Sequence, residues 1–150
     1  LKRKINFNLS KDSNLLLCEN IIFGRTSMKE EFEKGYFSDF WNINIDKKLI
    51  HTEAINTGLF EKKYLNSFST LNNNSAVATI IIVGNKFLNN VNNLSETLTN
   101  NENTTSNYSQ WDNKLIVRLL SKDSYNLKFA IDKILSYFFE GSKIPKIWNI

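Results

Sequence analysis

The sequence predicts a mainly β protein with mostly antiparallel or coiled sheets and one or two α-helices. Several short segments alternate apolar and polar residues or are rich in β-branched residues, both of which are typical of strands. One amphipathic helix is expected over about 124–140. Long helical crossovers between successive strands are missing from the pattern, and this disfavours a doubly wound parallel sheet.

The first two strands are expected near the start of the chain. Apolar residues alternate with polar ones over residues 5–9, and a second apolar stretch covers 15–23 and ends at Gly24. A strand so close to the first residue implies neighbouring strands upstream. Because the chain begins with Leu1 rather than Met, we also expect that the N-terminal part of the protein is absent from this sequence.

A β-hairpin is expected in the middle of the chain. Residues 41–45 alternate apolar and polar side chains, Asp46 and Lys47 occupy the turn, and 49–50 begin the return strand. Residues 76–83 form a β-branched run that indicates a buried strand.

The second half of the chain mixes helix and strand patterns. Residues 87–98 carry apolar residues at helical spacing, 100–109 are polar and predict a loop, and 114–120 predict a strand. The last residues, 147–150, indicate a short final strand.

The predicted helix at about 124–140 has one apolar stripe and terminal signals at both ends. Asp123 or Ser124 is suited to the N-cap, and Gly141 stands where a C′ glycine belongs. The apolar stripe consists of Leu127, Ile131, Ile134, Leu135 and Phe138.

Composition narrows the class of protein. The chain has 150 residues, 41% hydrophobic and 13% aromatic, which suits a single globular domain, and no apolar run approaches the roughly 20 residues that span a bilayer. Its net charge of +4 comes from interspersed charges without a nucleic-acid motif, so we expect neither nucleic acid nor membrane as a partner. The single cysteine, Cys18, permits no internal disulfide and suits a reducing cytoplasm.

His51 is the only histidine and the main candidate for chemistry. His51 and Glu53 lie on the same side of a predicted strand, and such a pair suits nickel, although two ligands make only a transient site. The alternative is a strand histidine beside a surface carboxylate. A hydrolase would also have to use His51, but the chain shows neither a nucleophile elbow nor a phosphate-binding loop.

Three segments, in order, resemble the urease accessory protein D family. Residues 19–30 (ENIIFGRTSMKE) are similar to the family pattern of an acidic residue, apolar residues, Gly-Arg, small residues, Met, Gly and Glu. Residues 78–84 (ATIIIVG) resemble the family's Ala-Thr strand. Residues 115–120 (LIVRLL), the amphipathic helix and 145–148 (PKIW) resemble its ending. Their order and spacing across most of the chain are more specific than any one segment.

The resemblance implies a β-helix-like stack of strands with two helices, forming a single domain over 1–150 that lacks the family's N-terminal portion. It implies a non-enzymatic scaffold that binds the urease structural subunits and accessory protein F, which recruits the GTPase accessory protein G. Nickel would pass through this assembly transiently into apo-urease, with no tightly bound cofactor. The alternative is a generic β-rich protein–protein interaction module unrelated to urease.

The resemblance also marks positions that would serve the structure or the passage of nickel. Two positions depart from the family pattern, because Lys29 stands where Gly is usual and Lys146 where Arg is usual. The charges of Arg25 and Glu30 would flank a turn, where they pair with each other or line a polar passage. The family positions are Glu19, Gly24, Arg25, Glu30, Thr79, Arg118, Pro145 and Trp148.

Overall fold

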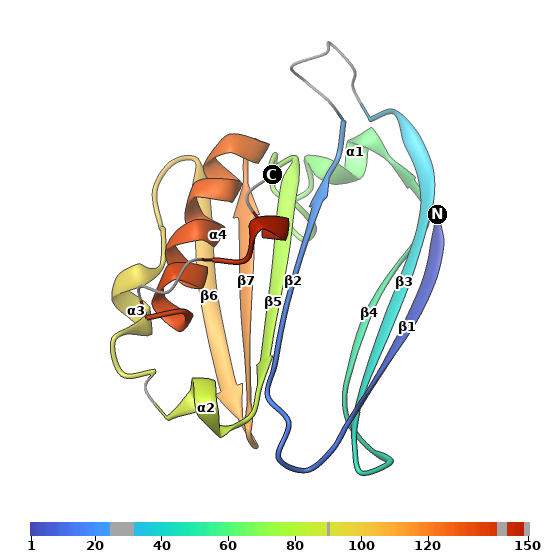
Figure 1. Ribbon diagram of the computed structural model, residues 1–150. Coiled ribbons are helices and arrows are strands. Elements are labelled where there is room, and N and C mark those ends of the chain that lie inside the picture. The colour runs from blue at the N-terminus through green and yellow to red at the C-terminus, as the bar shows by residue number, and fades with distance from the viewer. Residues whose placement is uncertain (25–31, 90, 141–143, 149–150) are drawn as a thin grey trace. The chain divides into compact units, whose positions relative to one another are not determined.

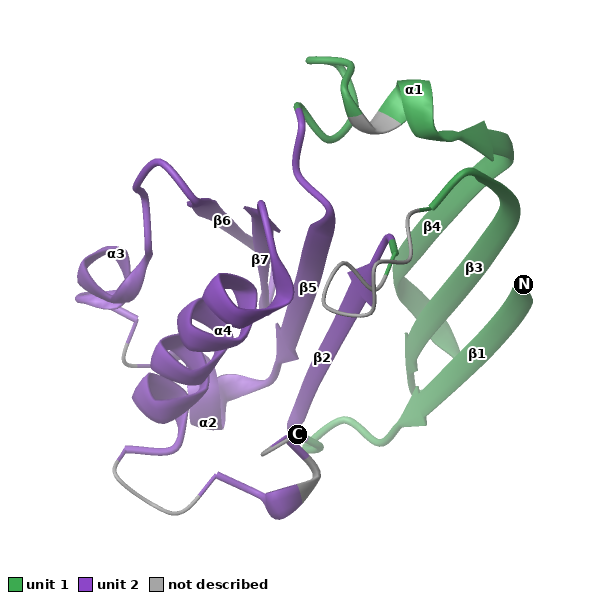
Figure 2. Cartoon of the chain, turned by 90° about the horizontal axis from the view of Figure 1, so that it is seen from above, with its two compact units in different colours: residues 1–13, 24–72 green, residues 14–23, 73–150 purple. Residues whose placement is uncertain are grey.

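The computed structural model describes residues 1–24, 32–89, 91–140 and 144–148, and Figure 1 labels its helices and strands. These residues form two compact units (Figure 2). Unit 1 comprises Leu1–Ser13 and Gly24–Asn72, and unit 2 comprises Asn14–Phe23 and Asn73–Ile150. The predicted mainly β class is confirmed, because each unit is built on a sheet and strands contain more residues than helices in both units. The single-domain organisation stays a prediction.

Unit 1 is built on a three-stranded sheet. Its strands are β1 (Lys2–Leu9), β3 (Lys34–Ile45) and β4 (Lys48–Glu61), in the order β1-β3-β4. The pair β3–β4 is antiparallel, as predicted, whereas β1 and β3 run parallel. The short helix α1 (Lys62–Leu65) follows β4 directly.

The predicted hairpin turn is confirmed. Asp46 and Lys47 have φ values of 47° and 67°, and Ile45 pairs with Lys48 across the two-residue connection. Positive φ at both central residues is the signature of a type I′ turn, whose twist matches that of the flanking strands.

The two faces of the unit 1 sheet differ in polarity. On one face the Asn42 side-chain amide donates to Asn6 Oδ1 at 2.9 Å and accepts from the Thr52 hydroxyl at 3.1 Å. On the other face Trp41 and Ile43 are buried. Alternation along β3 therefore separates an exposed polar face from a more buried face.

Unit 2 is built on a four-stranded sheet in which every adjacent pair is antiparallel. The strand order is β2-β5-β7-β6, so β2 and β6 form the edges. Its strands are β2 (Leu15–Ile22), β5 (Ala76–Val83), β6 (Thr104–Trp111) and β7 (Lys114–Ser121). The strands predicted over 15–23, 76–83 and 114–120 are confirmed.

One face of this sheet packs against helix α4 (Ser124–Phe138), as Figure 1 shows. Alternate residues of β5 and β7 share a buried core with the predicted apolar stripe of the helix. Asp123 is the N-cap, because its carboxylate accepts from the Asn126 N–H at 2.8 Å. The predicted helix is confirmed with its last residue at Phe138, and Gly141 lies outside the described residues. No helix in the described ranges combines the length and apolar character needed to cross a membrane.

The helix predicted over 87–98 is instead two separate four-residue helices. They are α2 (Asn85–Leu88) and α3 (Leu94–Thr97). Leu88 and Leu94 are both buried in the unit 2 core, so these apolar residues face the core although they do not belong to one helix. The asparagines between them are poor helix formers and interrupt the helix.

Two other expectations were wrong. The segment predicted as a loop, 100–109, contains most of β6. Apolar alternation did not reveal this strand, because its buried inward residues are hydroxyl residues rather than apolar ones. The strand predicted over 147–150 is a 3₁₀ turn, η2 (Lys146–Trp148), in the part that the structure describes. The Trp148 N–H donates to the Pro145 carbonyl at 3.0 Å, which closes this turn.

Candidate functional site

Three of the family positions form one row across the unit 2 sheet. Glu19 on β2 is the Cα partner of Thr79 on β5, and Thr79 is the partner of Arg118 on β7. The row ends at Asn107 on β6, the partner of Arg118. Glu19, Thr79 and Arg118, which are 39 or more residues apart in sequence, are thus brought to the same level of the sheet by strand register alone.

This row lies on the face opposite α4. Ala78 and Ile80 belong to the core beneath the helix, so Thr79 between them faces the other way. The same alternation places Arg118 between the core residues Val117 and Leu119. The helix therefore stabilises the sheet from one side while the polar row lies on the other.

A charge-assisted hydrogen bond fixes the centre of the row. Arg118 Nη1 donates to Thr79 Oγ1 at 2.7 Å. Thr79 is 9% exposed, whereas Arg118 is exposed, so the guanidinium reaches back from the surface to a buried hydroxyl. The hydrogen bond therefore orients a charge that is accessible to a partner.

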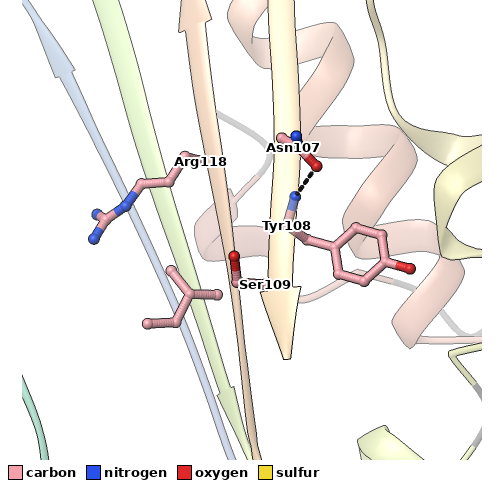
Figure 3. A pocket seen from close by; sticks show the side chains of 5 residues that line it. Asn107, Tyr108, Ser109 and Arg118 are labelled. Atoms are coloured by element: carbon pink, nitrogen blue, oxygen red, sulfur yellow. Dashed lines mark hydrogen bonds between the residues drawn. The ribbon is translucent and has the colours of Figure 1, made fainter. Parts of the chain in front are cut away.

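A pocket of about 180 Å³ adjoins the outer end of the row. Figure 3 shows the Arg118 and Tyr108 side chains leaving their strands in opposite directions. The pocket is lined by Asn107, Tyr108, Ser109, Ile116 and Arg118. Amide, hydroxyl and guanidinium groups beside an isoleucine suit the recognition of a polar side chain or small polar group.

The row combines one carboxylate, one hydroxyl, one guanidinium and one amide. These groups hold and orient hydrogen-bonding partners, but one carboxylate is a poor cation site by itself. Within the described residues, no group of three or more His, Cys, Asp and Glu side chains is placed to hold a metal ion. The row therefore fits recognition and orientation better than stable metal binding.

His51 and Glu53 lie in unit 1, on β4, and so belong to a different unit from the row. His51 Nε2 is 3.6 Å from Glu53 Oε2, and the two side chains are 11% and 12% exposed. The prediction that they share one side of a strand is confirmed. They pair with Ile43 and Trp41, two buried residues of β3 on the same face of the sheet, so Glu53 is not the surface carboxylate of the alternative interpretation. Their role as metal ligands stays a prediction.

A second charged pair on this sheet was missed by the sequence analysis. Arg3 Nε and Nη2 donate to the two carboxylate oxygens of Asp39 at 2.8 and 2.5 Å, and Asp39 is 3% exposed. The Arg3 guanidinium also lies 5.7 Å from the centre of the Trp41 ring. The hydrogen bond to Asp39 raises the pKa of Arg3. Parallel pairing of β1 with β3 creates this contact, and a single sequence carries no signal for that pairing.

The remaining family positions are spread along the chain. Gly24 follows β2 with φ 91°, a conformation that favours glycine, while Arg25 and Glu30, like Lys29, lie outside the described residues. Trp148 packs against the unit 2 core, with its ring centre 5.8 Å from that of Phe139. Pro145 precedes the turn that positions Trp148. Trp148 therefore completes the core beside α4.

Asn107 is the member of the row that sequence reasoning missed. It falls in the segment predicted as a loop, and asparagine there is one of many in an Asn-rich chain. Only the register of β6 on β7 shows that it continues the row of Arg118.

Comparison with known proteins identifies the family. The model of the UreD urease accessory protein family matches residues 1–149. This chain belongs to the UreD urease accessory protein family. Among curated relatives, the UreD protein of Rhizobium leguminosarum bv. viciae is 30% identical over 153 residues, which cover 100% of this chain and 54% of the relative. The UreD protein of Agrobacterium fabrum is 27% identical over 154 residues, covering 100% of this chain and 51% of the relative.

A third relative has a higher identity over a shorter stretch. The UreD protein of Granulibacter bethesdensis is 38% identical over 82 residues, covering 55% of this chain and 34% of that protein. This UreD-family chain spans about half the length of the first two curated relatives. Membership agrees with the resemblance of the three segments that contain Glu19, Thr79 and Arg118.

Proposed function

We propose that this chain acts in urease maturation, as part of a non-enzymatic cytoplasmic scaffold that helps to deliver nickel to apo-urease. Its partners would be the urease structural subunits and the accessory proteins F and G, and nickel would be a transient cargo rather than a tightly bound cofactor. The observation that carries the proposal is the match of the UreD family model over residues 1–149.

The polar row supports a contact role for unit 2. Arg118 is exposed, is oriented by its 2.7 Å hydrogen bond to Thr79 and adjoins a pocket with further hydrogen-bonding groups. A positioned guanidinium is a common anchor in protein interfaces because it binds carboxylates in a defined geometry. We therefore infer that Arg118 contacts a partner protein of the maturation complex.

The test measures both the capture of partner proteins and the activation of urease. The unchanged chain is expected to capture urease structural subunits and accessory protein F, and to support activation of apo-urease with nickel. Arg118→Ala is expected to reduce both by about tenfold, the loss that corresponds to about 1.4 kcal/mol of binding free energy. Lys133→Ala, on the exposed surface of α4, is the matched control and should leave both unchanged.

The outcomes separate the hypotheses. Failure of the unchanged chain to capture any of these proteins would favour the generic interaction module. Normal capture and activation by Arg118→Ala would remove the row from the interface. His51→Ala tests the remaining alternative, since full urease activation by this variant would exclude both a hydrolase centred on His51 and a required metal role for it.

A further inference from the structure

Strand β6 is an exposed edge that lacks the usual protection against pairing with another strand. It is the last strand of the unit 2 sheet, and its eight residues, TTSNYSQW, include neither a charged residue nor a proline. Edge strands commonly carry lysine, proline or a bulge, because their outward backbone groups otherwise recruit strands from other molecules. Such an edge needs another form of protection.

The register shows which backbone groups of β6 point outward. Trp111 and Lys114 close the two-residue connection to β7, and such a closing pair exchanges both of its backbone hydrogen bonds. Hydrogen-bonded and outward-facing residues then alternate along the strand. Thr104, Ser106, Tyr108 and Gln110 consequently direct their N–H groups to the outer edge.

The first three of these N–H groups each donate to an asparagine side chain. Thr104 N–H donates to Asn101 Oδ1 at 2.9 Å, and Ser106 N–H donates to Asn100 Oδ1 at 2.8 Å. Tyr108 N–H donates to Asn107 Oδ1 at 2.8 Å, the contact drawn in Figure 3. The side-chain oxygens therefore occupy the places that the carbonyls of an added strand would need.

Further hydrogen bonds hold the segment 99–103 along the edge. The Ser106 hydroxyl donates to the Thr99 carbonyl and accepts from the Thr99 N–H, both at 2.9 Å. The Asn101 N–H donates to the Thr104 carbonyl at 2.9 Å. At the other end, the Ser121 hydroxyl on β7 donates to the Asn103 carbonyl at 3.0 Å. The segment is thus fixed at both ends.

We propose that residues 99–103 are a strap that closes the outer edge of β6 to strand addition. Asn100 and Asn101 are its key residues, and Asn107 extends the protection along the strand. Among the described residues no strand extends the sheet beyond β6, and the strap keeps an added strand from pairing there. Without it, the first occupant is β6 of a second copy of this chain, because the two copies present the same uncharged edge. This proposal does not depend on a role in urease maturation.

The test removes the side-chain acceptors from the full chain. Asn100→Ala/Asn101→Ala is expected to raise the weight-average mass in sedimentation as concentration increases, relative to the unchanged chain. Asn100→Asp/Asn101→Asp keeps an oxygen that accepts each N–H but adds charge that itself opposes strand addition, so it is the matched control for the exchange measurement below rather than for sedimentation. Asn92→Ala, which removes an exposed asparagine between α2 and α3, controls for loss of a surface amide. Only the double alanine variant should associate.

Backbone hydrogen exchange gives a second, independent readout. In Asn100→Ala, the Ser106 amide is expected to exchange about fivefold faster, which corresponds to the loss of one hydrogen bond of about 1 kcal/mol. If the double alanine variant is unfolded, exchange in this single variant decides the question. A folded double variant whose mass is unchanged would overturn the proposal, as would an unchanged exchange rate at Ser106.

Discussion

The ionisation of the Cys18 thiol depends on the position of this residue on β2. The side chain packs against the unit 2 core, on the face covered by α4. Burial, with a smaller contribution from the negative charge of Asp132, raises the pKa of Cys18 from 9.0 to about 11. The thiol therefore remains protonated at neutral pH and behaves as a small apolar residue.

The raised pKa predicts an alkaline loss of stability. Between pH 9 and about 11 the unfolded chain releases the Cys18 proton while the folded chain keeps it, so the free energy of unfolding falls with rising pH. The full loss is about 2–3 kcal/mol, at about 1.4 kcal/mol per pKa unit. Urea denaturation of the unchanged chain and Cys18→Ala at pH 8 to 11 measures it. A difference between the two that stays constant across this range would contradict the assignment.

The Arg3–Asp39 pair predicts an asymmetry between its two partners. Asp39 is 3% exposed and the Arg3 side chain 37% exposed, so removing the arginine leaves a buried carboxylate. Asp39→Asn is expected to destabilise the fold by about 1–2 kcal/mol, and Arg3→Met by more, because a buried charge without its partner is costly. Chemical denaturation at pH 7 compares the two. Equal losses would indicate that Asp39 is well solvated without Arg3.

At this scale the sequence identified three of the four residues of the row but not the row itself. The positions of Glu19, Thr79 and Arg118 could be assigned to strands from apolar patterning and from the family resemblance. Their adjacency depends on the pairing register, which hydrophobic alternation does not encode for strands far apart in sequence. Asn107 could not be identified because its strand was predicted as a loop.

At the scale of elements, apolar periodicity predicted those strands and helices that bury apolar side chains. Strand β6 was not predicted, because its inward residues, Thr104 and Ser106, are buried hydroxyl residues. Thr104 Oγ1 lies 3.0 Å from the Ser121 hydroxyl, and Ser106 Oγ bonds to Thr99. Hydrogen bonds thus replace apolar contacts at these positions. Every second residue at the start of β6 is buried, but the sequence does not show this because the buried residues are polar.

The type I′ turn between β3 and β4 carries a residue poorly suited to it. Lys47 has φ 67°, where a β-carbon is unfavourable and glycine is preferred. Lys47→Gly is expected to stabilise the fold by about 0.5–1 kcal/mol, the size of the left-handed penalty less the entropy cost of glycine. Thermal denaturation measures the change. Lys48→Gly, one residue later in β4, should instead destabilise, and stabilisation by both variants would refute the turn argument.

At the scale of the whole molecule, the two units are interleaved in sequence. The chain builds β1 in unit 1, β2 in unit 2, then β3 and β4 in unit 1, before it returns to unit 2 at Asn73. The detour through β2 is what allows β1 and β3 to run parallel, because parallel neighbours need a crossover. Each unit therefore depends on a segment that is distant in sequence.

This interleaving predicts how fragments behave. Residues 73–150 alone lack β2 and leave the long apolar strand β5 at an edge, so this fragment should unfold without cooperativity or aggregate. Joining residues 14–23 to residue 73 through a short Gly-Ser loop should restore a cooperative thermal transition, because Ile22 and Ala76 are already paired. Circular dichroism melts compare the two proteins. Identical melts would mean that β2 contributes nothing to unit 2.

The interleaved order of the strands also determines how long each strand waits for its partner during synthesis of the chain. The apolar strand β2 leaves the ribosome well before β5, its hydrogen-bonding neighbour, and at ~5–20 residues per second the delay amounts to several seconds. During that interval Leu15, Leu16 and Leu17 have already been synthesised, but β5, the strand with which they pair, has not. In this interval the nascent chain is most accessible to chaperones and most prone to misassembly. Slower translation between Gly24 and Ser75 would lengthen the interval.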